Sequence, residues 1–207
     1  MKRGLVAIII AVTGVFLASY AHAEIEVKKK YYPNGKLKQE IPYKDGEIHG
    51  TMKSYYETGE LAQELIYDNG KKTHVIWYYK EGGISAERPY KNGKANGLEK
   101  GYYADGKLKT EISYKDGKIE GMLKGYYTNG NLRIEQPYKD GKIDGTEKLY
   151  RPDGSLRQEI PFVNGKKEGV GKVYDEDGGY VEVYFKGDKR VGVSKRYDKS
   201  GILISEE

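Results

Sequence analysis

Residues 102–125 read YYADGKLKTEISYKDGKIEGMLKG, and this 24-residue stretch decides the fold because the rest of the chain repeats it. The stretch holds two Asp-Gly pairs, Asp105-Gly106 and Asp116-Gly117. Glycine in such a pair accepts a positive φ without a Cβ clash, so each pair is typical of a β-hairpin turn. The residues between turns form runs of six to eight, which suit strands and are too short for helices. One unit therefore predicts two strands and two turns.

The unit recurs about eight times across residues 24–207, with a partial last copy, and recurrence at a fixed period is typical of repeat architectures. First-turn glycines follow one another at intervals of 24 residues, or in two places 23, and a tyrosine stands four residues before each of them. We expect these tyrosines and glycines to be structural. They are Tyr31, Tyr55, Tyr78, Tyr102, Tyr126, Tyr150, Tyr174 and Tyr197, with Gly35, Gly59, Gly82, Gly106, Gly130 and Gly154.

Later positions of the unit are also regular, with two departures. A glutamate stands five residues after the first-turn glycine in most copies, but in the seventh copy this position holds Val183. A third glycine closes most units, and in the second copy the same count of residues places His74 there. Because Val183 stands where a glutamate is expected, the seventh copy slips by one residue relative to the repeat pattern. Its strand pairing is open at this stage.

The strands show a period of two. Gln158, Ile160 and Phe162 share one face, opposite Glu159 and Pro161. Such alternation predicts a buried side and a solvated side, and it fixes the register of pairing. Four copies carry a proline in the second strand, which predicts an interruption or bulge in that strand. The expected fold is all-β: an elongated antiparallel meander of tandem hairpins of ~24 residues in a single-layer twisted sheet.

The pattern Y-Y-x-[ND]-G-x-L-x-x-E, repeated at this spacing over residues 28–207, resembles the MORN-variant repeat (membrane occupation and recognition nexus, second type). It is also similar to the repeat arrays of YwqK-type antitoxins. The resemblance implies an elongated sheet of hairpins and no shared enzyme activity. It implies varied functions: binding partner proteins, scaffolding, lipid contact, or neutralising a toxin.

Residues 1–23 predict a secretory signal peptide. Lys2 and Arg3 form a basic start, an apolar run follows, and Ala21-His22-Ala23 supplies a small-x-small cleavage site. We expect cleavage before Glu24, and export to the periplasm, outer envelope or medium. The alternative is an uncleaved membrane anchor, for which the apolar run is at the short limit. The chain has no cysteine, which excludes a disulfide framework and a lipid-modified N-terminal cysteine.

The charge and residue content argue against nucleic-acid binding, a zinc site and acid–base catalysis. The formal charge is +5, a mild bias that is not a nucleic-acid footprint. After the leader only His49 and His74 remain as histidines, and two histidines without a third ligand make a poor zinc site. The recurring glutamates lie on the predicted solvated face beside lysine or arginine, so they offer no acid–base pair. We expect no enzyme activity, no metal and no cofactor.

A second, less regular tyrosine follows the repeating one and points to the other face if the strand is regular. With the only tryptophan it forms the predicted contact surface: Tyr56, Trp77, Tyr79, Tyr103 and Tyr127. The partner is expected to be another protein, with a lipid headgroup or glycan as alternatives. The expected function is a non-catalytic binding or scaffold surface of the bacterial envelope; the alternatives are immunity to a toxin and a surface adhesin or host-directed factor.

Overall fold

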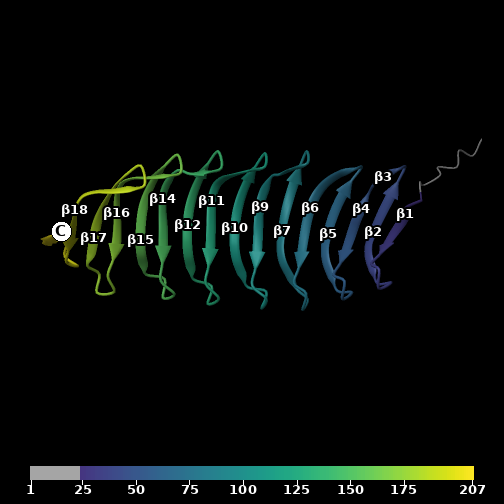
Figure 1. The fold of residues 1–207 in the computed structure, drawn as a ribbon, viewed down its shortest axis with the longest axis horizontal. Helices are drawn as coiled ribbons and strands as arrows, with labels where there is room; N and C mark the ends of the chain where they lie inside the picture. The colour runs from purple at the N-terminus through teal and green to yellow at the C-terminus, as the bar shows by residue number, and fades with distance from the viewer. Residues whose placement is uncertain (1–23) are drawn as a thin grey trace, which may run out of the picture.

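The computed structural model describes residues 24–207, which form one open antiparallel sheet (Figure 1). The sheet has 19 strands. The sixteen longer strands pair consecutively along the chain, and three two-residue strands pair only with the strand before them. These residues include no helix, and so none with the length and apolar character of a membrane span. The predicted all-β meander is confirmed. The predicted signal peptide lies outside the described residues.

Most of the strands have six to nine residues. Three two-residue strands, β3, β8 and β13, lead into β4, β9 and β14, so the 19 strands fill sixteen rows, two for each of eight copies. The strands are β1 (Glu26–Tyr31), β2 (Leu37–Lys44), β3 (Glu47–Ile48), β4 (Gly50–Tyr55), β5 (Leu61–Asp68), β6 (Lys71–Tyr78), β7 (Ile84–Lys91), β8 (Lys94–Ala95), β9 (Gly97–Tyr102), β10 (Leu108–Lys115), β11 (Lys118–Tyr126), β12 (Leu132–Lys139), β13 (Lys142–Ile143), β14 (Gly145–Tyr150), β15 (Leu156–Val163), β16 (Lys166–Tyr174), β17 (Tyr180–Lys186), β18 (Lys189–Tyr197) and β19 (Leu203–Glu206).

The two kinds of turn differ in backbone conformation. In the second turn both central residues have positive φ, as at Asp116 (φ 50°) and Gly117 (φ 88°), which is the requirement of a type I′ hairpin. In the first turn only the glycine does, as at Gly106 (φ 82°), and Tyr103 closes the loop by donating its N–H to the Lys107 carbonyl at 2.8 Å. The predicted hairpin signals are thus both correct, with two different geometries.

The two 23-residue intervals each remove one residue from a bulge and leave the pairing intact. In the second copy β6 runs unbroken, and Ile66 pairs with His74 while Tyr67 pairs with Lys72, so Thr73 is the extra residue. In the other copies the third glycine stands opposite an aromatic residue on the strand that follows the next first turn. Gly50, for example, stands opposite Tyr67. Thr73, rather than His74, therefore takes the place of the missing glycine, which corrects the alignment made from the sequence.

The seventh copy is corrected in the same way. β16 pairs with β17 without any register shift, whereas the equivalent pair β4–β5 has a bulge beside Tyr55. Losing that bulge residue brings Glu182, rather than Val183, opposite Lys172, so the repeating glutamate is present after all. Tyr180 takes the usual leucine position and stacks on the Tyr197 ring, with centroids 4.8 Å apart.

The proline-bearing strands are not interrupted, but a bulge is present beside Pro161, where the register of the strand pair shifts between Glu159 and Phe162. Pro42 lies inside an unbroken β2, and the break falls in the facing strand at His49, between β3 and β4. The His49 N–H donates to the Pro42 carbonyl at 3.1 Å, but proline has no N–H to return the bond. The missing N–H donor of the proline therefore breaks the facing strand and leaves the proline-bearing strand continuous.

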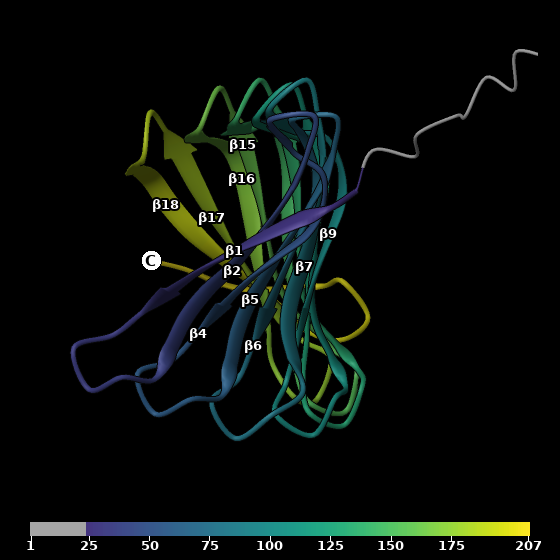
Figure 2. The same cartoon turned by 90° about the vertical axis from the view of Figure 1, so that its right-hand side faces the viewer.

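The core is a thin row of side chains on one face. Its most buried members are Val75, 2% exposed, Ile160, 5% exposed, and Ile41, 6% exposed. They alternate with the repeating glutamates along the strands, as the period of two predicts. The strands bow and turn progressively along the ribbon, as Figure 2 shows, so the sheet is twisted as well as elongated.

Candidate protein-binding surface

The face opposite the buried row carries a ladder of alternating lysine and glutamate that crosses the strands. Each repeating glutamate stands opposite a lysine on the next strand, as Glu40 does opposite both Lys29 and Lys53. Five neighbouring pairs form ion pairs, from 3.2 Å at Lys29–Glu40 to 3.8 Å at Lys53–Glu64. In order, the ladder is Lys29, Glu40, Lys53, Glu64, Ile76, Glu87, Lys100, Glu111, Lys124, Glu135, Lys148, Glu159, Lys172, Glu182, Lys195 and Glu206.

The repeating tyrosines hold this ladder from one side. Tyr102 donates its hydroxyl to Glu87 Oε1 at 2.6 Å, and Tyr78 donates to Glu64 Oε2 at 2.7 Å. The same bond recurs from Tyr55 to Tyr197, at lengths between 2.6 and 3.3 Å. The Glu64 side chain is only 18% exposed, so the glutamates are half-buried under these rings rather than fully solvated as expected.

Burial and this hydrogen bond both raise the tyrosine pKa. Desolvation is the larger cause and the carboxylate acceptor is the next, because both oppose formation of a phenolate. The pKa of Tyr102 rises to about 12, and so do those of its equivalents Tyr55, Tyr78, Tyr126, Tyr150 and Tyr174. In return, hydrogen bonding from Tyr55 lowers the pKa of the Glu40 carboxyl. The ladder is therefore a structural network of protonated phenols and ionised carboxylates.

The second tyrosines make a different bond, which sequence reasoning missed. Tyr103 donates its hydroxyl to the main-chain carbonyl of Tyr126, one unit ahead, at 2.6 Å. Tyr56, Tyr79 and Tyr127 do the same to the tyrosine one unit ahead, at 3.0, 2.6 and 2.7 Å. All four side chains are half-buried and lie beside the first turns. They thus link neighbouring units, and a role in binding a partner stays a prediction.

Trp77 is the next-to-last residue of β6, two residues before Tyr79, and it pairs with Gln63 and Ala86 on the flanking strands. The Arg88 guanidinium lies 5.4 Å from its ring centroid and also pairs with Glu99. Whether Trp77 and the second tyrosines form one contact surface stays a prediction.

The ladder is interrupted once, at Ile76 in β6, between Glu64 and Glu87. Other apolar side chains gather around the interruption: Ile66, Pro89 and Leu98. With His74, Glu87, Arg88 and Lys100 they line a hollow of about 330 Å³. Leu98 is 41% exposed, and Ile66 and Ile76 are half-buried. The second and third copies thus form an apolar recess at the one interruption of the Lys–Glu ladder.

The remaining sequence candidates are His49, between β3 and β4, His74, within β6, and the acidic turn at residues 175–178. The ring nitrogen Nδ1 of His49 accepts the Asn69 N–H at 3.3 Å, and His74 is exposed in β6. In the acidic turn at residues 175–178, Asp175 pairs with Arg196 at 2.8 Å. Among residues 24–207, no three potential ligands are placed to hold a metal ion.

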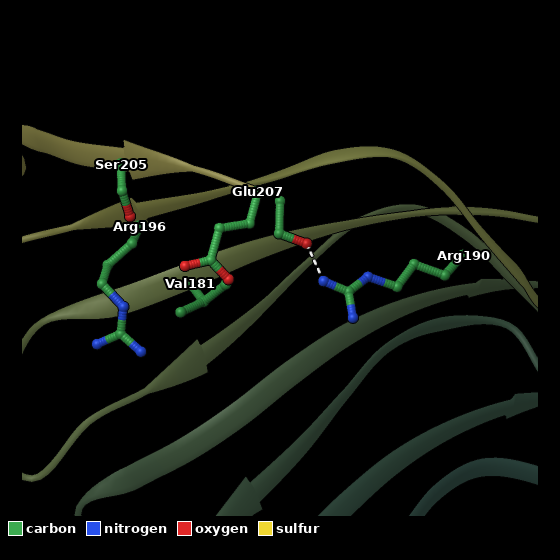
Figure 3. Close-up of a pocket in the computed structure, with 6 residues that line it drawn as sticks. Val181, Arg190, Arg196, Ser205 and Glu207 are labelled. Carbon is green, nitrogen blue, oxygen red and sulfur yellow. Dashed lines mark hydrogen bonds between the residues drawn. The ribbon is translucent and has the colours of Figure 1, made fainter.

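A smaller hollow, of about 200 Å³, lies at the C-terminal end of the sheet, and Figure 3 shows its lining. Arg190 and Arg196 extend toward it from opposite sides, with the Glu207 side chain between them. Arg190 donates to the Ser194 hydroxyl and Arg196 pairs with Asp175. Both guanidinium groups thus already have partners within the fold.

An open sheet of tandem hairpins, with the same tyrosine–glutamate bond at seven of the eight repeating tyrosines, defines an elongated repeat protein. Six segments match the model of the MORN repeat variant: residues 27–45, 48–69, 73–92, 95–116, 119–140 and 143–164. Since these segments cover more than half of the chain, the chain belongs to the MORN repeat variant family. Proteins built from this repeat are generally non-catalytic binding modules.

A search of curated proteins found no match. Among solved structures, one chain of a crystal structure of the GtfA/B complex bound to UDP and GlcNAc is 16% identical to this chain. The match covers 55% of this chain and 22% of the other, with a TM-score of 0.27. A likeness this low carries no argument about fold or function.

Proposed function

We propose that the chain is an exported, non-catalytic module of the bacterial envelope that binds another protein through the apolar recess around Ile76. The observation that carries this proposal is the single apolar interruption of the Lys–Glu ladder. The fold does not require isoleucine there, because Tyr78 still bonds Glu64 at 2.7 Å as its equivalents do in the other copies. A side chain that the fold leaves free is available for recognition.

The recess has the anatomy of a small protein interface. Ile76, Ile66 and Leu98 supply an apolar centre, while Glu87 and Lys100 supply a charged rim. Interfaces concentrate their binding energy in a few apolar anchors at such a centre and gain specificity from the rim. Burying one leucine-sized side chain of a partner there would contribute about 1.5–3 kcal/mol.

The rest of the ribbon suits a scaffold role. A single layer of strands has two large faces and a thin core, so it offers a long surface for its mass. Export rests on the leader at residues 1–23. Immunity to a toxin would use the same recess, with the toxin as the partner protein.

The test is site-specific photocrosslinking in envelope extracts. A photoreactive residue replaces Leu98 in the full chain, and the adducts are identified by mass spectrometry. We expect one dominant protein adduct, which disappears when Ile76→Lys is added to fill the recess with a charge. A matched control, Lys124→Ile, interrupts the ladder elsewhere and should leave the adduct unchanged.

Two results would reject the proposal. One is an adduct that persists at full yield in the Ile76→Lys chain. The other is an equal loss of the adduct in the Lys124→Ile chain, since this would make the charge pattern, and not the recess, the feature that the partner reads. Circular dichroism of each variant checks that the fold is kept.

A further inference from the structure

The net charge is not spread evenly over the ribbon but is separated between its two long edges. The second turns form one edge, which we call the second-turn edge: residues 44–48, 68–72, 91–95, 115–119, 139–143, 163–167 and 186–190. It holds 14 Lys or Arg against 6 Asp or Glu, a net of +8.

The first turns form the opposite edge, the first-turn edge: residues 32–36, 56–60, 79–83, 103–107, 127–131, 151–155, 175–179 and 198–202. It holds 5 Lys or Arg against 9 Asp or Glu, a net of −4. A whole-chain charge of +5 therefore conceals a strongly basic edge and an acidic one. Figure 1 shows the two rows of turns along opposite sides of the ribbon.

Most cations of the second-turn edge are available to a ligand. The exceptions include Arg190, which donates to the Ser194 hydroxyl, and Lys72 and Lys167, which lie over the rings of Tyr90 and Phe185. Among the cations of this edge, within residues 24–207, only Lys118 forms an ion pair, with Asp140 at 3.5 Å. By contrast, Glu120 and Asp144 accept main-chain N–H groups of the next turn, from Asp140 at 2.7 Å and Asn164 at 3.0 Å. Nearby carboxylates thus serve to join the turns, while most of the lysines extend into solvent.

The lysines also form a row. The residue after the second-turn glycine is lysine in five of seven copies, at Lys71, Lys94, Lys118, Lys142 and Lys166, and acidic in the first and the seventh, at Glu47 and Asp188. The stems of Lys94, Lys118 and Lys142 pack beside the glycine of the following turn, as Lys94 does at Gly117. Two strands separate equivalent residues, so the row has a pitch of roughly 10 Å.

We propose that the second-turn edge binds a flexible, linear, phosphate-bearing polyanion that lies along this row of lysines. A regular pitch of cations favours a ligand with many equivalent charges. The twist of the sheet makes the edge follow a curved path, as Figure 2 shows. A flexible polymer can follow such a path, whereas a flat anionic surface can contact only part of it. The surface is separate from the recess at Ile76, so this proposal stands or falls independently of the proposed function.

The test uses long-chain inorganic polyphosphate as the probe and measures its affinity for the full chain. About five engaged lysines give a slope of log K against log salt of about −3.5, so affinity should fall about a hundredfold between 50 and 200 mM salt. The triple variant Lys94→Glu, Lys118→Glu and Lys142→Glu should lose at least about tenfold in affinity.

A matched variant separates the edge from net charge. Lys36→Glu, Lys80→Glu and Lys107→Glu change the formal charge equally but on the first-turn edge, and should change the affinity by less than about twofold. An equal loss in both triple variants would overturn the proposal, because binding would then follow net charge alone. Binding to vesicles containing phosphatidylglycerol without binding to polyphosphate would overturn it too and make the edge a membrane contact.

Discussion

The charged ladder between Lys100 and Glu159 and its interruption at Ile76 are built on the same backbone yet present different chemistry. Both stretches keep the tyrosine–glutamate bond, at 2.8 Å for Tyr126 to Glu111 and 2.7 Å for Tyr78 to Glu64. Only the side chain between the two glutamates has changed, from lysine to isoleucine. The difference teaches that strand pairing and tyrosines hold the fold, while the ladder position is free to vary with function.

The strongest way to break this comparison is to remove one tyrosine from each stretch. Tyr126→Ala and Tyr78→Ala should each lower the free energy of unfolding by about 2–3 kcal/mol, because truncating a fully buried aromatic ring costs about 3–5 kcal/mol and these rings are half-buried. Urea unfolding is followed by circular dichroism and by the fluorescence of Trp77, the only tryptophan. A much smaller loss for Tyr78→Ala would mean that the apolar recess, and not the tyrosine, holds the interrupted stretch.

Alkaline pH should weaken both stretches together. A tyrosine has a pKa near 10 in the unfolded chain and about 12 in the fold at six positions. The unfolded chain therefore loses its phenol protons first, so this stabilisation is complete below about pH 10 and is lost as pH rises toward 12.

The measurement is the melting temperature across this range by circular dichroism, and it should fall steeply. Removing the hydroxyl groups with Tyr126→Phe and Tyr78→Phe should make the fall shallower by similar amounts. A melting temperature that stays flat to pH 12 would contradict the assigned bonds.

A smaller effect is expected at the second tyrosines, which join one unit to the next. Tyr103→Phe removes the bond to the Tyr126 carbonyl and should cost about 1 kcal/mol in stability, since that is the usual net value of one hydrogen bond. Tyr79→Phe is the matched change beside the interruption and should cost the same. Unchanged urea midpoints in both would restore these residues to a purely binding role, as the sequence alone had indicated.

Much of this architecture could be predicted from the sequence, because its period is local. Tyr102, Gly106 and Asp116-Gly117 specify a hairpin through turn geometry and alternation, and those signals need no knowledge of distant residues. The family resemblance followed from the same residues. The number of rows in the sheet also followed, since each of the eight units adds two rows.

The errors arose where counting along the chain differs from pairing across it. Val183 fills the glutamate position by count, but a lost bulge residue places Glu182 opposite Lys172. Similarly, the break caused by Pro42 appears at His49, on the facing strand. A bulge changes register without a distinct sequence signal, so only the pairing reveals it.

The candidate site was less predictable for the same reason. Ile76 stands out only when Glu64, Ile76 and Glu87 are aligned across three strands as one row. Read along the chain, Ile76 is an ordinary strand residue next to Trp77. The hydrogen bond from the Tyr103 hydroxyl likewise joins residues 23 positions apart in the chain, and no local sequence pattern predicts it.

The smallest expected effect sharpens the comparison most directly, because it converts one stretch into the other. Ile76→Lys restores an unbroken ladder and places an ammonium between the carboxylates of Glu64 and Glu87. Exposed ion pairs contribute about 0–1 kcal/mol, so stability should stay level or rise within that range. The reciprocal change, Lys124→Ile, should lower it by no more than the same amount.

Both shifts should shrink in 1 M salt, because the Debye length falls to about 3 Å there. The measurement is the urea midpoint of each variant at low and high salt. A loss of more than about 2 kcal/mol from Ile76→Lys, insensitive to salt, would mean that Ile76 is part of the packing of the sheet. Stability that barely moves would instead leave recognition as the reason for an isoleucine at a position where the sheet accepts lysine in every other copy.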